Sequence, residues 1–196
     1  SERDPVSARL LEIIGLGNPT LRGRMGVADE DLLYYTGLLG MQQRNAASLQ
    51  RMVEDYFGVQ AEVVQFVGGW SPLARDSLCI LDDEPDELAA GLGNHTVVGD
   101  EIWDPQARVR VRIGPLSRER FDEFLPGGEG HRALSAFTDF FGRGELDFEV
   151  QLVLAREDVP PVVLGGEGDE VTPLSWCTWI RTRPFTRDAD ETTLTL

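Results

Sequence analysis

The chain has 196 residues, of which 41% are hydrophobic, so it can bury the core of one ordinary domain or of two small ones. Its formal net charge is −16, and its cationic side chains are all arginines. Such an acidic chain repels phosphate groups, which argues against nucleic acid and anionic membrane surfaces as partners. No apolar run approaches the roughly 20 residues that cross a bilayer, so we expect no membrane insertion.

The first half of the sequence predicts three helices and two strands. Asn45 is a suitable N-cap for the third helix, and Gly58 is a suitable C-terminal stop. β-branched residues favour the strands, and the stretch Gly68–Pro72 is expected to end the first of them. The expected elements are helices over residues 1–14, 29–40 and 45–58 and strands over residues 59–67 and 108–113.

The strand expected over residues 108–113 has a strict period of two. Arg108, Arg110 and Arg112 alternate with β-branched residues, which places the three guanidinium groups on one face. Like charges about 7 Å apart repel one another unless they are compensated. We therefore expect carboxylates of this chain or of a partner to pair with these arginines, and we include them among the candidate partner-binding residues. The alternative is a solvated face.

The second half predicts two helices, two strands and a polar end. Ser117 is a suitable N-cap for the first helix, and Pro126 with the two glycines after it is expected to end that helix. Trp176 and Trp179 fall in the last expected strand. The expected elements are helices over residues 117–125 and 133–142, strands over residues 146–154 and 174–182, and a polar, flexible tail after residue 184.

A helix followed by a strand occurs twice. The first helix ends in Asp-Tyr-Phe-Gly at residues 55–58 and the second in Asp-Phe-Phe-Gly at residues 139–142. Chance similarity of two α/β units is the alternative to a true repeat. We expect an α+β fold of two pseudo-repeated helix-helix-strand-hairpin modules. The expected division is an N-terminal arm over residues 1–27, a first α+β module over 28–115, a second over 116–184 and a flexible tail over 185–196.

Two apolar loops are expected at equivalent places of the repeat, one over residues 69–73 and one over residues 159–164. Loops usually lie at the surface, so large apolar side chains in them indicate a docking surface. The alternative is that both loops fold back onto the core. The candidate partner-binding residues of these loops are Trp70, Pro72, Leu73, Pro160, Pro161, Val162, Val163 and Leu164.

Histidine and cysteine are too few and too scattered to predict a catalytic or metal site. His95 and His131 have no ligand-type neighbour at turn or helical spacing. Cys79 and Cys177 lie far apart and form no Cys-x-x-Cys motif. We expect no catalytic residue, no cofactor and no metal, and therefore no enzyme.

Several short stretches, spread over nearly the whole chain, match one known family in order and spacing. They are Gly15–Gly17, Leu21–Arg24, Leu33–Leu39, Arg44–Leu49, Asp55–Val59, Gln65–Val67, Trp103, Arg112–Leu116, Phe124–Gly128, Gln151–Leu154 and Leu174–Trp176. Together they resemble the TssG family of type VI secretion systems. The family's proteins are longer and carry an N-terminal region that this chain lacks, and the tail beyond Arg183 has no match in the family.

The resemblance implies a structural subunit of the type VI secretion baseplate wedge. Such a subunit binds TssF and TssE and docks trimeric TssK adaptors, with the wedges arranged around a central spike. It works in the cytoplasm, at the inner face of the bacterial inner membrane. The two loops would then be two similar docking sites for TssK. The alternatives are a wedge protein of an extracellular contractile injection particle or phage-tail-like baseplate, and an enzyme of unknown type.

Overall fold

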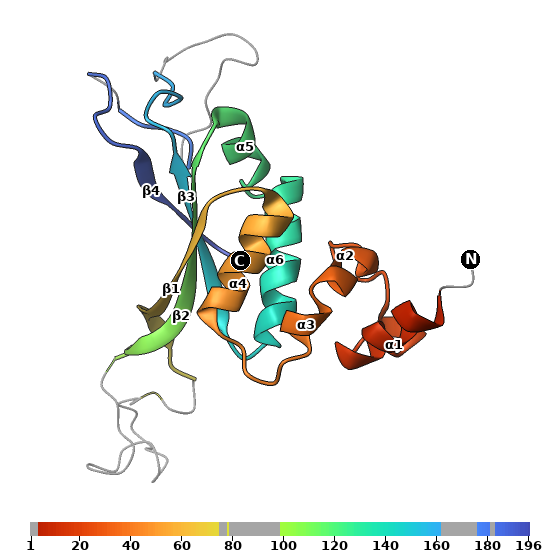
Figure 1. Cartoon of the computed structure of the whole chain (residues 1–196). Coiled ribbons are helices and arrows are strands. Elements are labelled where there is room, and N and C mark those ends of the chain that lie inside the picture. The colour runs from red at the N-terminus through yellow and green to blue at the C-terminus, as the bar shows by residue number, and fades with distance from the viewer. Residues whose placement is uncertain (1–3, 75–77, 79–98, 162–175, 181–182) are drawn as a thin grey trace, which may run out of the picture. The chain divides into compact units, whose positions relative to one another are not determined.

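The computed structural model describes residues 4–74, 78, 99–161, 176–180 and 183–196 (Figure 1). Contacts divide the chain into two units. The first contains residues 1–64 and 109–196, and the second contains residues 65–108. Within the described ranges, no helix is both long enough and apolar enough to cross a membrane.

The helices of the described residues all belong to the first unit. At the start of α4, the Asn45 side chain accepts a hydrogen bond from the Ser48 N–H at 2.8 Å. At its end, Gly58 adopts a left-handed conformation with φ 63°, which glycine adopts without a steric cost. Both boundaries were predicted, and the structure confirms them. The helices are α1 (Pro5–Ile13), η1 (Pro19–Leu21), α2 (Asp29–Tyr34), α3 (Thr36–Leu39), α4 (Ala46–Phe57), α5 (Arg118–Glu123) and α6 (Glu129–Gly142).

Four strands form one mixed sheet in the order β1-β2-β3-β4. They are β1 (Ala61–Pro72), β2 (Glu101–Leu116), β3 (Asp147–Leu154) and β4 (Ala189–Thr195). Strands β3 and β4 are antiparallel. The Ala155 N–H donates to the Leu116 carbonyl, and Arg110 pairs with Glu149 at the same offset, so β2 and β3 run parallel. Helices α5 and α6 connect these two parallel strands (Figure 1).

In the first unit, α4 and α6 lie against one face of the sheet (Figure 1). The apolar residues of both helices recur at helical spacing. They pack onto β2 and β3, where every second side chain points inward. Burying one Leu or Phe side chain contributes about 1.5–3 kcal/mol, so this interface supplies much of the stability of the unit. Its most deeply buried members include Leu49, Met52, Val111, Ile113, Leu134, Phe137, Leu152 and Leu154.

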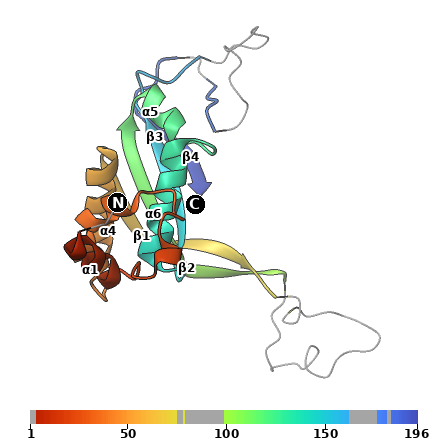
Figure 2. The same ribbon diagram turned by 90° about the vertical axis from the view of Figure 1, so that its right-hand side faces the viewer.

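The second unit contains residues 65–72 of β1 and residues 101–108 of β2, which run side by side as a two-stranded ribbon (Figure 2). The Leu73 N–H donates to the Asp100 carbonyl at 2.8 Å, so the pairing continues past Pro72. Phe66 has φ 60°, a left-handed conformation that is unusual for any residue other than glycine.

The predicted loop over residues 69–73 is wrong, because these residues up to Pro72 belong to β1. The Gly-Gly pair and the proline favour a turn locally, but pairing with β2 overrides that preference. Pro72 is the last residue of the strand, where the missing N–H removes no ladder bond from its interior. Likewise, the strand expected over residues 108–113 extends over Glu101–Leu116.

The predicted flexible tail over residues 185–196 is also wrong, since Ala189–Thr195 form β4. Ala189, Thr192 and Leu194 are buried, and the Leu196 N–H donates to the Phe148 carbonyl at 3.0 Å. The strand expected over residues 174–182 does not form in its described part, residues 176–180. Most residues of this segment are polar, so its composition predicted a flexible tail although three of its side chains point into the core.

The predicted α+β class is confirmed. Helix α4 is followed by β1, and α6 is followed by β3, so the element order agrees with the expected repeat. The repeat itself and the module boundaries at residues 28–115 and 116–184 stay predictions.

Candidate partner-binding surfaces

The predicted arginine face lies on the side of β2 opposite the buried Val111 and Ile113. In the first unit, the Arg110 Nε–H donates to Glu149 Oε1 of the neighbouring strand β3. The Glu149 side chain is only 7% exposed, and that of Arg110 is 32% exposed. A charge-assisted bond shielded from water is stronger than a surface ion pair, so this contact joins β2 firmly to β3.

Arg112 extends the same set of ion pairs to both edges of the sheet. Its guanidinium lies 3.7 Å from Glu62 of β1 and 3.6 Å from Asp190 of β4. The Gln151 side chain donates to the Asp190 carbonyl at 2.6 Å. Arg108 also has an interaction partner. The predicted pairing with carboxylates is therefore confirmed for Arg110 and Arg112, and it neutralises much of their charge within the chain.

The ribbon of the second unit carries an exposed aromatic cluster. Trp70 and Trp103 meet edge to face, with ring centroids 5.4 Å apart and planes at 67°. Trp70 is 58% exposed and Phe66 is 70% exposed. Exposed rings next to one another are typical of a protein interface rather than of a solvated strand. The ribbon cluster is defined here as Phe66, Trp70 and Trp103.

Gly68 is required for the position of Trp103. A Cβ atom at Gly68 would lie 2.2 Å from the Trp103 ring, so Gly68→Ala is expected to displace that ring and break the tryptophan pair. The matched control is Gly69→Ala, whose Cβ would meet Ala107 at 3.4 Å. Indole N–H resonances in an NMR spectrum check this: only Gly68→Ala should shift the Trp103 signal. An unchanged signal would show that the ring does not pack there.

The second predicted loop is only partly described. Val159 is buried, and the Asp158 N–H donates to the Ala155 carbonyl, so the loop begins as a turn folded onto the core. Pro160 is half-buried and Pro161 is exposed. Val162, Val163 and Leu164 lie outside the described residues, and their docking role stays a prediction.

The histidines and cysteines do not converge among the described residues. Cys177 is buried, and burial raises the pKa of its thiol. His131 is half-buried on α6, and burial lowers the pKa of its imidazole. His95 and Cys79 lie outside the described residues. Within the described ranges, no group of three or more His, Cys, Asp or Glu side chains could hold a metal ion.

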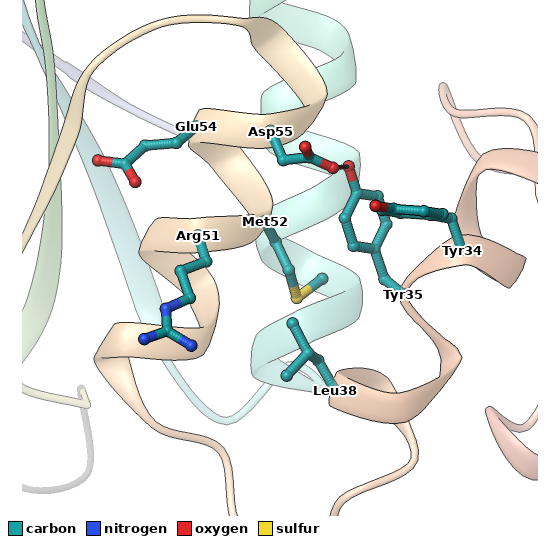
Figure 3. Close-up of a pocket in the computed structure, with 7 residues that line it drawn as sticks. All are labelled: Tyr34, Tyr35, Leu38, Arg51, Met52, Glu54 and Asp55. Atoms are coloured by element: carbon teal, nitrogen blue, oxygen red, sulfur yellow. Dashed lines mark hydrogen bonds between the residues drawn. The ribbon is translucent and has the colours of Figure 1, made fainter.

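An open groove of about 770 Å³ lies between α3 and α4 in the first unit (Figure 3). Met52 is buried, and its side chain points toward Leu38 across the groove. Tyr34, at the end of α2, is 77% exposed and meets the Tyr35 ring edge to face at 5.0 Å. The α3–α4 groove is defined by its lining residues Tyr34, Tyr35, Leu38, Arg51, Met52, Glu54 and Asp55.

Two tyrosine–aspartate hydrogen bonds tie α4 to the helices before it. The Tyr35 hydroxyl donates to Asp55 at 2.7 Å, and the Tyr56 hydroxyl donates to Asp31 at 3.4 Å. Burial, more than the nearby carboxylate, raises the pKa of both phenols above the usual 10.0. The neutral hydroxyl donates to the carboxylate, whereas a phenolate would repel it.

These raised pKa values predict a loss of stability at alkaline pH. In the unfolded chain each phenol ionises at about pH 10.0, whereas in the folded chain it keeps its proton to a higher pH. The contribution of these tyrosines to the free energy of unfolding is therefore fully present below pH 10 and is lost as the pH rises above it. The chain has no lysine to obscure this range. Tyr35→Phe should cost about 1 kcal/mol at pH 8 and then flatten the decline above pH 10. Urea unfolding at pH 8 and pH 11 checks this. If the free energy of unfolding falls by the same amount between these pH values in Tyr35→Phe and in the wild type, the prediction is contradicted.

The family described as "Type VI secretion, TssG" matches residues 1–181. The chain belongs to the TssG family. The resemblance expected from the sequence is therefore confirmed. A comparison with curated proteins finds no match.

Two solved structures resemble this TssG-family chain in fold. One, from the "type VI secretion system TssK-TssF-TssG baseplate subcomplex" determined by cryo-electron microscopy, has a TM-score of 0.74 at 23% identity and covers 99% of this chain and 78% of the other. The second, "The baseplate complex from the type VI secretion system", has a TM-score of 0.59 at 18% identity. It covers 100% of this chain, which spans 54% of that one.

In this TssG-family chain, the sequence predicted Trp70 as a partner-binding residue, which stays a prediction, but it did not predict its neighbours in the ribbon cluster. Phe66 and Trp103 lie within stretches that match the family, yet nothing in their local pattern predicts exposure. The α3–α4 groove was missed as well, because its lining combines residues of three helices. Only the spatial approach of these helices reveals it.

Proposed function

We propose that the chain is a structural subunit of the type VI secretion baseplate that works by binding other baseplate proteins, without catalysis. The observation that carries this proposal is the family match over residues 1–181. The likeness in fold to a chain of a TssK-TssF-TssG subcomplex supports it. TssF and TssK are accordingly the proposed partners.

The finer proposal is a place in the baseplate wedge. There the chain contacts TssE as well as TssF, and the wedges surround the central spike at the inner face of the bacterial inner membrane. A wedge protein of an extracellular contractile particle or phage-tail-like baseplate is the second candidate. A gene for a membrane-complex protein beside this one favours type VI secretion, and its absence favours the particle.

For TssK docking we propose the ribbon cluster together with the loop over residues 160–164. Trp70 and Trp103 offer rings that a partner can cover, and aromatic residues dominate the binding energy of many interfaces. The ion pairs of Arg110 and Arg112 leave that face less suited to a partner's carboxylates. We therefore assign these two arginines mainly to stability, with only a secondary part in binding.

A cell-based experiment tests the proposed function. Bacteria that lack this gene should form no contractile sheaths, as seen with a fluorescently labelled sheath protein, and the intact gene should restore them. The physical reason is that a sheath cannot nucleate on an incomplete baseplate. Normal sheath assembly without the gene would refute the proposal.

A further inference from the structure

Phe66 has a backbone conformation that neither its residue type nor its place in a strand explains. Its φ is 60°, in the left-handed region, where the Cβ atom of any residue other than glycine meets steric resistance. Among the described residues, a positive φ occurs at seven glycines and at two other residues, Phe66 and Arg143. Arg143 follows α6, where a left-handed residue commonly ends a helix, whereas Phe66 lies inside β1. The strained backbone at Phe66 therefore has no such local cause.

The Phe66 ring gains little from the folded chain in return for this strain. It is 70% exposed, and it belongs neither to the buried core nor to the tryptophan pair of the ribbon. An aromatic ring stabilises a fold mainly through the apolar area that it removes from water, and this ring removes little. The described part of the chain therefore does not offset the strain at Phe66, which lowers the stability of the ribbon.

The left-handed backbone also sets the direction of the Phe66 ring. A Cβ atom at Gly68 would point at the Trp103 ring, and Trp70 meets the same ring, so Gly68 and Trp70 share one face of the ribbon drawn in Figure 2. In a regular strand, the side chain at position 66 would continue this alternation. A left-handed residue inside a strand is typical of a β-bulge, which interrupts the alternation and re-aims a side chain. The backbone conformation, and not the period of the strand, therefore determines where this ring is presented.

We propose that the strained backbone of Phe66 aims its ring at TssK, so that the ribbon loses some stability and gains affinity. This inference rests on the proposed function, which assigns the ribbon cluster to TssK. Trp70 and Trp103 already pack on each other, whereas Phe66 is the most exposed ring of the cluster. Strain that persists at an exposed residue is typical of a site that is organised before its partner binds, because the cost of ordering has already been met in the free protein.

Two substitutions of equal size separate the effect of the backbone from that of the side chain. Phe66→Leu and Phe66→Ile leave apolar side chains of the same composition, but the β-branch of isoleucine resists the left-handed conformation far more than leucine does. Phe66→Leu should weaken TssK binding about fivefold, and Phe66→Ile should weaken it at least about tenfold further. Titration of purified TssK by calorimetry measures both. Equal affinities of the two variants would show that only apolar area matters at this position.

A glycine at position 66 tests the strain itself. Phe66→Gly removes the steric resistance to the left-handed backbone, so the amides of the ribbon should exchange with deuterium about two- to fivefold more slowly. TssK binding should nevertheless fall at least about 30-fold, because the ring is lost. Val67→Gly is the matched control, because Val67 is the next residue of β1 and has no positive φ. In this control the ribbon amides should exchange faster, since glycine weakens an ordinary strand.

The outcomes separate this inference from the proposed function. Failure of the wild-type chain to bind TssK would overturn both. Normal binding by the wild type, together with equal affinities of Phe66→Leu and Phe66→Ile or with faster exchange in Phe66→Gly, would overturn the role of Phe66 alone. Wild-type affinity of Phe66→Gly for TssK would show that the ring lies outside the interface. Because Phe66 is exposed, none of these substitutions opens a cavity in the core, and circular dichroism should give unchanged spectra.

Discussion

Replacing Trp70 with Asp is expected to weaken binding to TssK at least about 30-fold while leaving the fold and TssF binding intact. Trp70 is 58% exposed and touches the ring of Trp103, so the isolated chain does not depend on burying it. In a complex, a covered aromatic anchor contributes about 2–4 kcal/mol. An aspartate there would also place an unpaired charge in an apolar contact. Titration of purified TssK by calorimetry measures the change.

The control for this prediction is Ile180→Asp. Ile180 is 90% exposed and lies in the first unit, so this variant makes the same kind of change away from the ribbon cluster. It should bind TssK normally. Val163→Asp tests the second loop and should weaken binding by a similar factor, and the double variant should lose more, because two sites on one chain raise the effective concentration. Wild-type affinity of Trp70→Asp would remove the ribbon cluster from the interface.

Local signals in the sequence predicted the central helices and strands. Asn45 and Gly58 mark the two ends of α4, because a side-chain cap and a left-handed residue act within one helical turn. The period of two in β2 placed the arginines opposite Val111 and Ile113, because alternation is a property of any strand. These features depend on neighbours in the sequence, and they can be read without the rest of the fold.

Features that depend on distant pairing could not be predicted. β1 continues through two glycines because residues near Asp100 supply a partner strand. β4 forms from a polar segment because β3 offers it a free edge. The ribbon cluster and the α3–α4 groove depend in turn on how these elements pair and pack. Composition alone therefore assigned two of these regions, a loop and a tail, incorrectly.

Reversing the charge of Arg110 is expected to destabilise the first unit by about 3 kcal/mol and to lower its melting temperature by about 10 °C. Arg110→Glu removes one partner of Glu149, whose side chain is 7% exposed, and places a second carboxylate beside it. Two like charges held together at a nearly buried site cost several kcal/mol, although water at the partly exposed position 110 reduces this. Thermal unfolding followed by circular dichroism measures the effect.

Arg112→Glu is the matched control, because its ion pairs are longer and more exposed. Arg112→Glu should lower the free energy of unfolding by about 1 kcal/mol or less. The exchange of both residues, Arg110→Glu with Glu149→Arg, should recover part of the lost stability. If Arg110→Glu melts at the wild-type temperature, the arginine face does not stabilise the sheet.

Co-purification of the chain with TssF and TssK from the same gene cluster tests the central claim most directly. A structural baseplate subunit should elute with both proteins as one species in size-exclusion chromatography, with light scattering giving a mass that contains all three. Trp70→Asp should remove TssK alone from that species. Elution of the wild-type chain as a free protein in the presence of both partners would contradict the claim.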